Sequence, residues 1–107
     1  FGEFYKINDK STNAPAARNV FANLKPGDMP LPEAALEKLV ARGVNFAVCN
    51  MAITVYSGIF AQQMGLQADA VKQDWIANRL PGITVVPSGV VAVNGAQSKG
   101  CSYCYAG

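Results

Sequence analysis

Histidine is absent from this chain of 107 residues, and clustered charge is scarce. Without histidine, the chain cannot hold the Ser-His or Cys-His arrangements of hydrolases, and it lacks the most frequent zinc ligand. Charged residues make up 15% of the sequence, and the nine basic and seven acidic side chains are scattered along it. Because no Lys/Arg cluster is present, we expect no nucleic-acid partner.

Long apolar runs are missing as well. No run approaches the ~18 residues of a membrane span, and no segment has the pattern of a signal peptide. Half of the residues are hydrophobic, so length and composition indicate one small globular domain with a single core. The chain begins at Phe1 rather than Met, which is consistent with a processed or partial product and leaves the compartment open.

The first third of the chain has little helix or strand signal. Residues 8–32 carry four of the six prolines, and they read as a long loop that wraps a surface or contacts a partner. Residues 1–7 are rich in aromatics and fit a strand or the tail of a preceding element. We expect charged residues of this region, such as Asp9 and Arg18, to be solvated. We therefore assign residues 1–31 to an extended, partner-contacting segment.

From Pro32 onward, helical and strand patterns alternate, which predicts an α/β fold with a mainly parallel sheet flanked by helices. Asp69 is the expected N-cap of the third helix, and Trp75 the expected packing anchor within it. Ile53, Tyr56, Ile59, Phe60 and Met64 form an apolar stripe on the second helix, which indicates core rather than a cofactor site. The predicted helices cover residues 32–42, 51–64, 69–80 and 90–99, and the predicted strands cover residues 44–49, 83–86 and 101–105.

Three strands make a thin sheet. We infer that further strands come from another chain or from sequence before Phe1, so that the partner is a missing N-terminal half or a second chain in a homo- or hetero-oligomer.

Cys49 has the most informative position among the three cysteines. It ends a short apolar run, and Asn50, a good N-cap residue, opens the next helix. The unpaired N–H groups and positive dipole end of a helix favour thiolate over thiol at such a position. The alternative is a buried cysteine that fills a small apolar slot.

Cys101 and Cys104 have C-x-x-C spacing, but they lie on a predicted strand, where residues three apart are ~10 Å apart and point to opposite faces. A disulfide between them requires the strand to break, because bridged Cα atoms lie within roughly 7 Å. A 49–104 pair is geometrically better, and core filling is the default for both residues. With no histidine and one C-x-x-C, we expect no metal site and no cofactor.

Three segments, taken in order, resemble the DsrE/DsrF-like (TusD-like) sulfur-relay family over roughly residues 32–107. The segments are Leu36-Glu37-x-Leu39-x-x-x-Gly43-Val44-x-Phe46-x-Val48-Cys49-x-x-Ala52, Pro81-Gly82-Ile83-Thr84-Val85-Val86-Pro87-Ser88-Gly89-Val90 and Gln97-x-x-Gly100-x-x-Tyr103. The resemblance implies a DsrE-like sheet whose opening strand-helix-strand is absent here, so that residues 32–107 are the C-terminal part of one domain. It also implies that Cys49 carries sulfur as a persulfide in sulfurtransferase-like chemistry.

Three hypotheses about function follow. The first is a sulfur-handling protein in which Cys49 is the nucleophile, the helix that Asn50 opens stabilises its anion, and Ser88 and Gly89 line the same crevice. The second is a non-catalytic binding or assembly subunit with the same fold, and the third is a redox protein that cycles a Cys49–Cys104 disulfide. The region before Pro32 is similar to an exported branch of the family, which suggests a periplasmic location, with the cytoplasm as the alternative.

Overall fold

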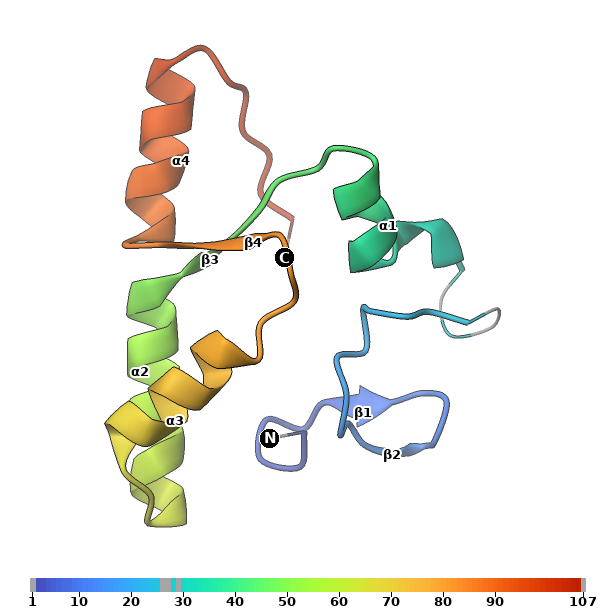
Figure 1. Cartoon of the computed structure of the whole chain (residues 1–107), viewed down its shortest axis with the longest axis vertical. Helices are drawn as coiled ribbons and strands as arrows, with labels where there is room; N and C mark the ends of the chain where they lie inside the picture. Colours follow the sequence, from blue (N-terminus) through green and yellow to red (C-terminus); the bar gives the residue numbers. More distant parts are fainter. Residues whose placement is uncertain (1, 26–27, 29, 107) are drawn as a thin grey trace. The chain divides into compact units, whose positions relative to one another are not determined.

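The computed structural model describes residues 2–25, 28 and 30–106, and the chain divides into two compact units (Figure 1). The first unit is Phe1–Val44 and the second is Asn45–Gly107. The second unit holds the parallel sheet, and it therefore holds Cys49.

The first unit combines a small hairpin with two short helices. Strand β1 (Asn8–Asp9) pairs antiparallel with β2 (Ala14–Pro15), and the 3-10 helix η1 (Pro32–Ala34) precedes α1 (Leu36–Ala41). The predicted start of the first helix at Pro32 is confirmed at η1, and the chain then turns at Ala35 before α1. Hydrogen bonds within the segment, rather than a large apolar core, hold the residues around the hairpin.

Asp9 and Arg18 are the centre of that hydrogen-bond network, and the prediction that Asp9 is solvated is wrong. Asp9 is only 4% exposed, and it accepts hydrogen bonds from the backbone N–H and hydroxyl of Ser11 at 2.9 and 2.6 Å. Arg18 donates to it at 2.7 Å from Nε and also pairs with Asp28. A carboxylate tolerates burial when it is paired and hydrogen-bonded in this way.

The second unit is a small α/β arrangement whose centre is a two-stranded parallel sheet. Strand β3 (Phe46–Cys49) pairs with β4 (Ile83–Val86), and the register places Cys49 opposite Val86. Helices α2 (Asn50–Met64) and α3 (Ala68–Ala77) connect the strands, and α4 (Gly89–Ser98) follows β4. A parallel pair requires such a crossover connection, and the β-branched run Ile83–Val86 suits a buried strand.

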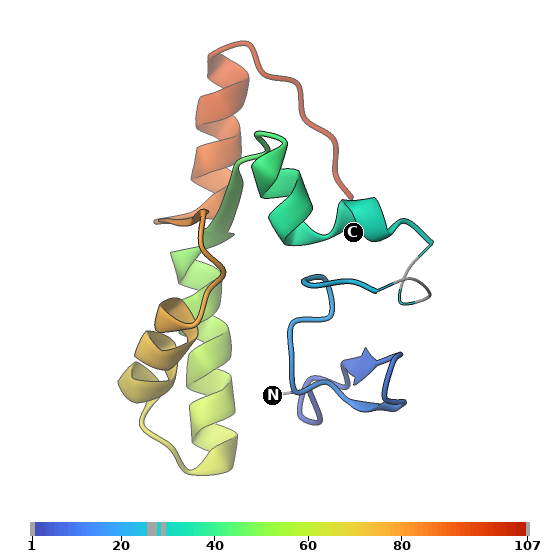
Figure 2. The ribbon, with the colours of Figure 1, turned by 45° about the vertical axis from the view of Figure 1, so that its right-hand side comes forward.

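Helices α2 and α3 lie side by side and make the apolar core of this unit (Figure 2). The rings of Phe60 and Trp75 meet with centroids 5.9 Å apart, which confirms Trp75 as a packing anchor. Small residues Ser57 and Ala61 are fully covered on the inner face of α2, and Val71 of α3 is buried. Gly65 ends α2 in the left-handed conformation with φ of 68°, as the sequence predicts.

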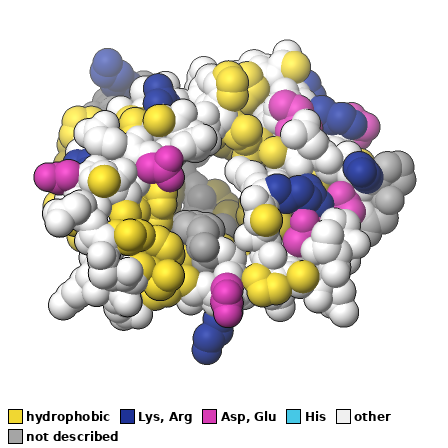
Figure 3. Space-filling model, turned by 60° about the horizontal axis from the view of Figure 1, so that its bottom comes forward, with side chains coloured by type: hydrophobic (Ala, Val, Ile, Leu, Met, Phe, Trp, Pro, Cys, Tyr) yellow, Lys and Arg dark blue, Asp and Glu magenta, His cyan; other side chains and the backbone are white. Residues whose placement is uncertain are grey.

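The predicted apolar stripe of α2 is only partly core. Ile53 and Phe60 are half-buried, whereas Tyr56, Ile59 and Met64 are 54%, 41% and 56% exposed. Hydrophobic side chains are accordingly visible at the surface of the molecule (Figure 3). The stripe prediction was wrong for these three residues, because α2 meets α3 and the sheet on one side only.

The sheet is smaller than the sequence predicts. Residues 101–106 are extended but form no strand, so the predicted third strand at 101–105 is wrong. The described residues therefore form a mixed α/β fold with four α-helices and a two-stranded parallel sheet flanked by helices. A strand needs a neighbour for its backbone groups, and within the described residues none pairs with this segment.

Two predicted helix caps are also wrong by one or two positions. Cys49 itself is the N-cap of α2, and Asn50 is the first helical residue. Gln67 is the N-cap of α3, and Asp69 lies inside its first turn, where a carboxylate still suits the helix dipole.

Over the part of the chain that the structure describes, no helix has the length and apolar character needed to cross a membrane.

Candidate functional site

Cys49 lies at the junction between β3 and α2, where a strand ends and a helix begins. Its backbone is extended (φ −78°, ψ 117°), as an N-cap requires, and its Sγ accepts a hydrogen bond from the N–H of Ala52 at 3.4 Å. Serine, threonine, aspartate or asparagine oxygens usually occupy this role. In this position the sulfur lies where the N–H groups of the first turn of the helix, which have no partner within the helix, can donate to it.

A second helix begins against the same sulfur. Because β3 and β4 are parallel and Cys49 is opposite Val86, the turn after β4 brings the start of α4 beside Cys49. A Cβ atom added to Gly89 would lie 3.4 Å from the Cβ of Cys49 and 3.9 Å from its Sγ. Gly89 thus lies beside the cysteine with room for a methyl group between them, and α2 and α4 both begin next to Cys49.

The electrostatic result is a thiol that ionises more readily than usual. The pKa of Cys49 is lowered from its ordinary value, first by the N–H of Gly89, then by the N–H of Ala52, and also by the N–H of Met51. Burial opposes this effect and raises the pKa, because the thiol is half-buried. N–H groups of two helices outweigh burial, so the site favours an anion on sulfur.

The other predicted site residues contribute through their position rather than through side-chain contacts to Cys49. Ser88 is the N-cap of α4, but its hydroxyl makes no capping hydrogen bond. Asn50 accepts a hydrogen bond from the Thr54 hydroxyl at its carbonyl, at 2.8 Å. Gly89 acts through its backbone N–H.

Met51 and Ala52 are N–H donors to this site that the sequence alone does not single out. The available signal was their location in the first turn of a helix that directly follows Cys49.

Cys101 and Cys104 are outside this site. All three cysteines are free thiols, and Cys101 and Cys104 are exposed, so the prediction that these two fill the core is wrong. Cys49 and Cys104, the better candidates for an internal pair, are not bonded to each other in this structure. Within the described residues no group of three or more His, Cys, Asp or Glu side chains is placed to hold a metal ion.

A cavity of about 340 Å³ lies in the first unit. Apolar Ile7, Val20 and Phe21 line it beside the Asp9–Arg18 pair. These two charges are hydrogen-bonded to each other and thereby stabilise the loop structure.

Comparisons with protein-family models, with curated proteins and with solved structures found no significant match to this chain.

Proposed function

We propose that this protein is a sulfur carrier in which Cys49 holds a sulfane sulfur as a persulfide. The observation that supports the proposal is the meeting of two helix N-termini, α2 and α4, at one half-buried thiol whose pKa is lowered. The resemblance of residues 32–107 to DsrE-like sulfur-relay proteins points to the same residue. Under this proposal the finer fold is a DsrE-like domain whose sheet is completed by additional strands.

The chemistry requires no cofactor and no external oxidant. The Cys49 thiolate attacks the outer sulfur of a persulfide donor, R–S–SH, so that a bond forms between Cys49 Sγ and that sulfur. The S–S bond of the donor breaks, and R–S⁻ leaves with the electron pair. The N–H groups of Gly89, Ala52 and Met51 stabilise the attacking thiolate, and they remain at hand to stabilise the anionic persulfide that forms.

Replacing Cys49 by Ser tests the proposal, with Cys101→Ser as the matched control. Each protein is incubated with one equivalent of glutathione persulfide and desalted, and its sulfur content is mapped by peptide mass spectrometry. We expect the initial sulfur loading of Cys49→Ser to be at least tenfold lower than that of the wild type. Cys101→Ser should load like the wild type. Equal initial loading of wild type and Cys49→Ser would reject the role of Cys49.

A non-catalytic assembly subunit is the second candidate, and specific observations favour it. Met51, Val55 and Ile59 follow one another on one face of α2 and are 62%, 55% and 41% exposed. The parallel sheet has only two strands, whereas small sheets usually have more. A homo- or hetero-oligomer that covers α2 and adds strands would resolve both features. Light scattering tests this candidate by measuring the mass in solution of the wild type and of Val55→Lys. A wild type that is a monomer, with the same mass as Val55→Lys, would count against this candidate.

A further inference from the structure

The cavity of the first unit has no part in the chemistry described above. Its volume is about 340 Å³, its apolar lining comes from Ile7, Val20 and Phe21, and its polar lining includes Asp9 and Arg18. An apolar cavity of ~150 Å³ holds one benzene ring, so this volume admits a small organic molecule.

The two exposed apolar walls of this cavity are fixed by their backbones. The N–H of Ile7 donates to the carbonyl of Gly2 at 2.8 Å, and its carbonyl accepts from the N–H of Ala16 at 2.8 Å. The carbonyl of Phe21 accepts from the N–H of Leu36 at 2.9 Å. Ile7 is nevertheless 37% exposed and Phe21 is 55% exposed. A preformed apolar surface of this kind gains free energy when a ligand covers it, and it loses little entropy in doing so.

The polar groups of Asp9 and Arg18 are directed at each other. Nε and Nη2 of Arg18 donate to the two carboxylate oxygens of Asp9 at 2.7 and 3.1 Å, and Nη1 donates to the carbonyl of Ala22 at 3.3 Å. Asp9 is only 4% exposed, whereas 38% of the Arg18 side chain is exposed. Because all three guanidinium nitrogens already donate, Arg18 offers a ligand the flat face of this group.

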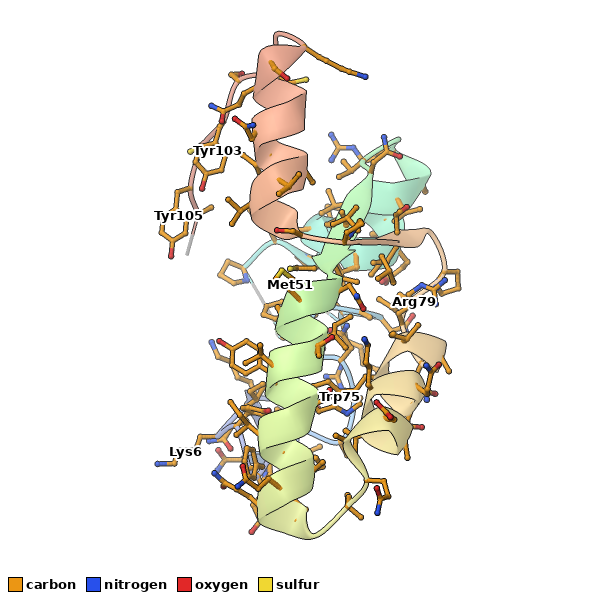
Figure 4. The ribbon with its side chains drawn as sticks, turned by 90° about the vertical axis from the view of Figure 1, so that its left-hand side faces the viewer. Lys6, Met51, Trp75, Arg79, Tyr103 and Tyr105 are labelled. Carbon is orange, nitrogen blue, oxygen red and sulfur yellow. The ribbon has the colours of Figure 1, made fainter. Side chains whose placement is uncertain are left out.

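The charges around the cavity cancel. Asp9 and Asp28 are the acidic residues of its lining, and Lys10 and Arg18 are the basic ones. Lys6 is exposed, points outward and lies outside the lining (Figure 4). An anion would find Arg18 already bound to Asp9, and a cation would have to compete with Arg18 for a buried carboxylate. The lining therefore suits an uncharged ligand.

We propose that this cavity binds an uncharged aromatic ring of a small molecule. The ring lies against the guanidinium face of Arg18 and in contact with Ile7 and Phe21. A guanidinium stacks on aromatic faces, and pairs of aromatic rings gain free energy beyond the area that they bury. The inference does not depend on the proposed function, because the cavity lies in the first unit and Cys49 in the second.

Titration with phenol, followed by nuclear magnetic resonance, tests the proposal. Phenol should shift the amide resonances of Val20 and Phe21 and the Nε–H resonance of Arg18, with half-saturation on the order of millimolar for so small a ligand. The amide resonances of Phe60 and Trp75, in the second unit, should not move. Shifts that do not saturate, or that are as large in the second unit as at the cavity, would overturn the proposal.

Cyclohexanol is the matched probe, because it has the size and the hydroxyl group of phenol but no aromatic ring. We expect cyclohexanol to bind at least threefold more weakly than phenol. Equal half-saturation by the two probes would mean that the apolar walls alone bind them, and it would overturn the assignment of an aromatic ligand.

Variants of the wall test the location of the ligand. Phe21→Ala should raise the half-saturation concentration of phenol at least fivefold, and its fold should persist because the Phe21 ring is 55% exposed. Leu31→Ala is the matched control, since Leu31 is an exposed apolar residue of the same unit that does not line the cavity. Unchanged binding by Phe21→Ala, or equal losses in the two variants, would contradict the proposed site.

Arg18→Lys tests the contact with the guanidinium, because it keeps the positive charge beside Asp9 and removes the planar group. This variant should lose the preference for phenol over cyclohexanol, and the amide resonance of Ser11 shows whether the hairpin is retained. A folded Arg18→Lys that keeps the preference would refute the stacking on Arg18. The comparison of the two probes on the wild type decides the nature of the ligand without any variant.

Discussion

At the scale of single residues, the backbone N–H of Gly89 has the largest effect on the pKa of the Cys49 thiol. Gly89 is the first residue of α4, and its N–H is the leading cause of the lowered pKa of Cys49. Two substitutions at this position separate the effect of the N–H donor on the pKa of Cys49 from the effect of added side-chain volume. Proline removes the N–H, whereas alanine keeps it, and both add side-chain atoms.

We predict that Gly89→Pro raises the pKa of Cys49 and slows its alkylation at neutral pH several-fold, whereas Gly89→Ala changes both little. Proline is favoured at the first position of a helix, and the extended backbone of Ser88 (φ −146°, ψ 127°) suits the residue before a proline. The Cβ of alanine would meet Cys49 at 3.4 Å, an ordinary contact.

The measurement for this prediction is the pH dependence of iodoacetamide alkylation, in a Cys101→Ser/Cys104→Ser background so that only Cys49 reacts. Circular dichroism of each variant confirms that α4 is retained. Equal shifts in the pKa of Cys49 for Gly89→Pro and Gly89→Ala would mean that the volume of the added side chain, and not the loss of the N–H, changes this pKa.

The junction at Cys49 and the position of Gly89 beside it were both predicted from the sequence, whereas the register that sets the distance between them could not be derived from it. A strand that ends in cysteine before a helix is a local pattern that the sequence contains. The approach of Gly89 depends on the parallel register that puts Val86 opposite Cys49, and this register is a long-range property.

At the scale of helices and strands, the glycines of α2 have opposite roles. Gly58 is in the middle of α2 and Gly65 follows its last residue with φ of 68°, and a Cβ at either position would meet nothing within 4 Å. Backbone conformation alone therefore decides the effect of a substitution.

We predict that Gly58→Ala stabilises the protein by about 0.5–1 kcal/mol, because alanine loses less conformational entropy in a helix. Gly65→Ala should destabilise it by about 1–2 kcal/mol, because alanine is strained in the left-handed conformation. Urea unfolding followed by circular dichroism measures both changes. The same sign for both variants would contradict the assigned end of α2.

Helix and strand prediction succeeded where the local sequence is sufficient. Strand Ile83–Val86 and the end of α2 at Gly65 agree with the prediction. Helix α3 ends at Ala77 rather than near Leu80, because the side chains of Asn78 and Arg79 bond to its last carbonyls, those of Asp74 and Ile76. Such side-chain hydrogen bonds compete with the helix and carry no periodic signal.

At the scale of the whole molecule, the two units differ in what holds them together. The second unit has the Phe60–Trp75 contact and the parallel sheet, whereas the hairpin region of the first depends on the ionised carboxylate of Asp9. Hydrogen bonds from Ser11 and then from Arg18 lower the pKa of Asp9 from 3.8 to about 2. The first unit should therefore be sensitive to acid.

We predict that Asp9→Asn lowers the stability of the first unit at neutral pH, and that this difference from the wild type disappears in acid. A carboxylate whose pKa is lower in the folded state stabilises that state fully above its unfolded value, near 3.8. The contribution falls as the pH decreases from that value toward about 2. Amide hydrogen exchange at Ser11 and Asn13 measures the local stability of the first unit. If the difference in this stability between the wild type and Asp9→Asn is as large at low pH as at neutral pH, the prediction is refuted.

The extent of the sheet is the whole-molecule property that the sequence predicted least well. Residues 101–105 have a strand pattern, but pairing requires a neighbouring backbone that the described chain does not supply. The exposed apolar face of α2 has the same origin, since periodicity marks a surface to be covered and does not identify what covers it.

The most direct test of the central claim is the intact mass of the native protein isolated without reductant, with peptide mapping of Cys49. The account predicts a fraction of molecules that carry one additional sulfur atom, which maps to Cys49 and is removed by reductant. A Cys49 that is unmodified and also resists alkylation in the folded protein would contradict it and identify a structural thiol.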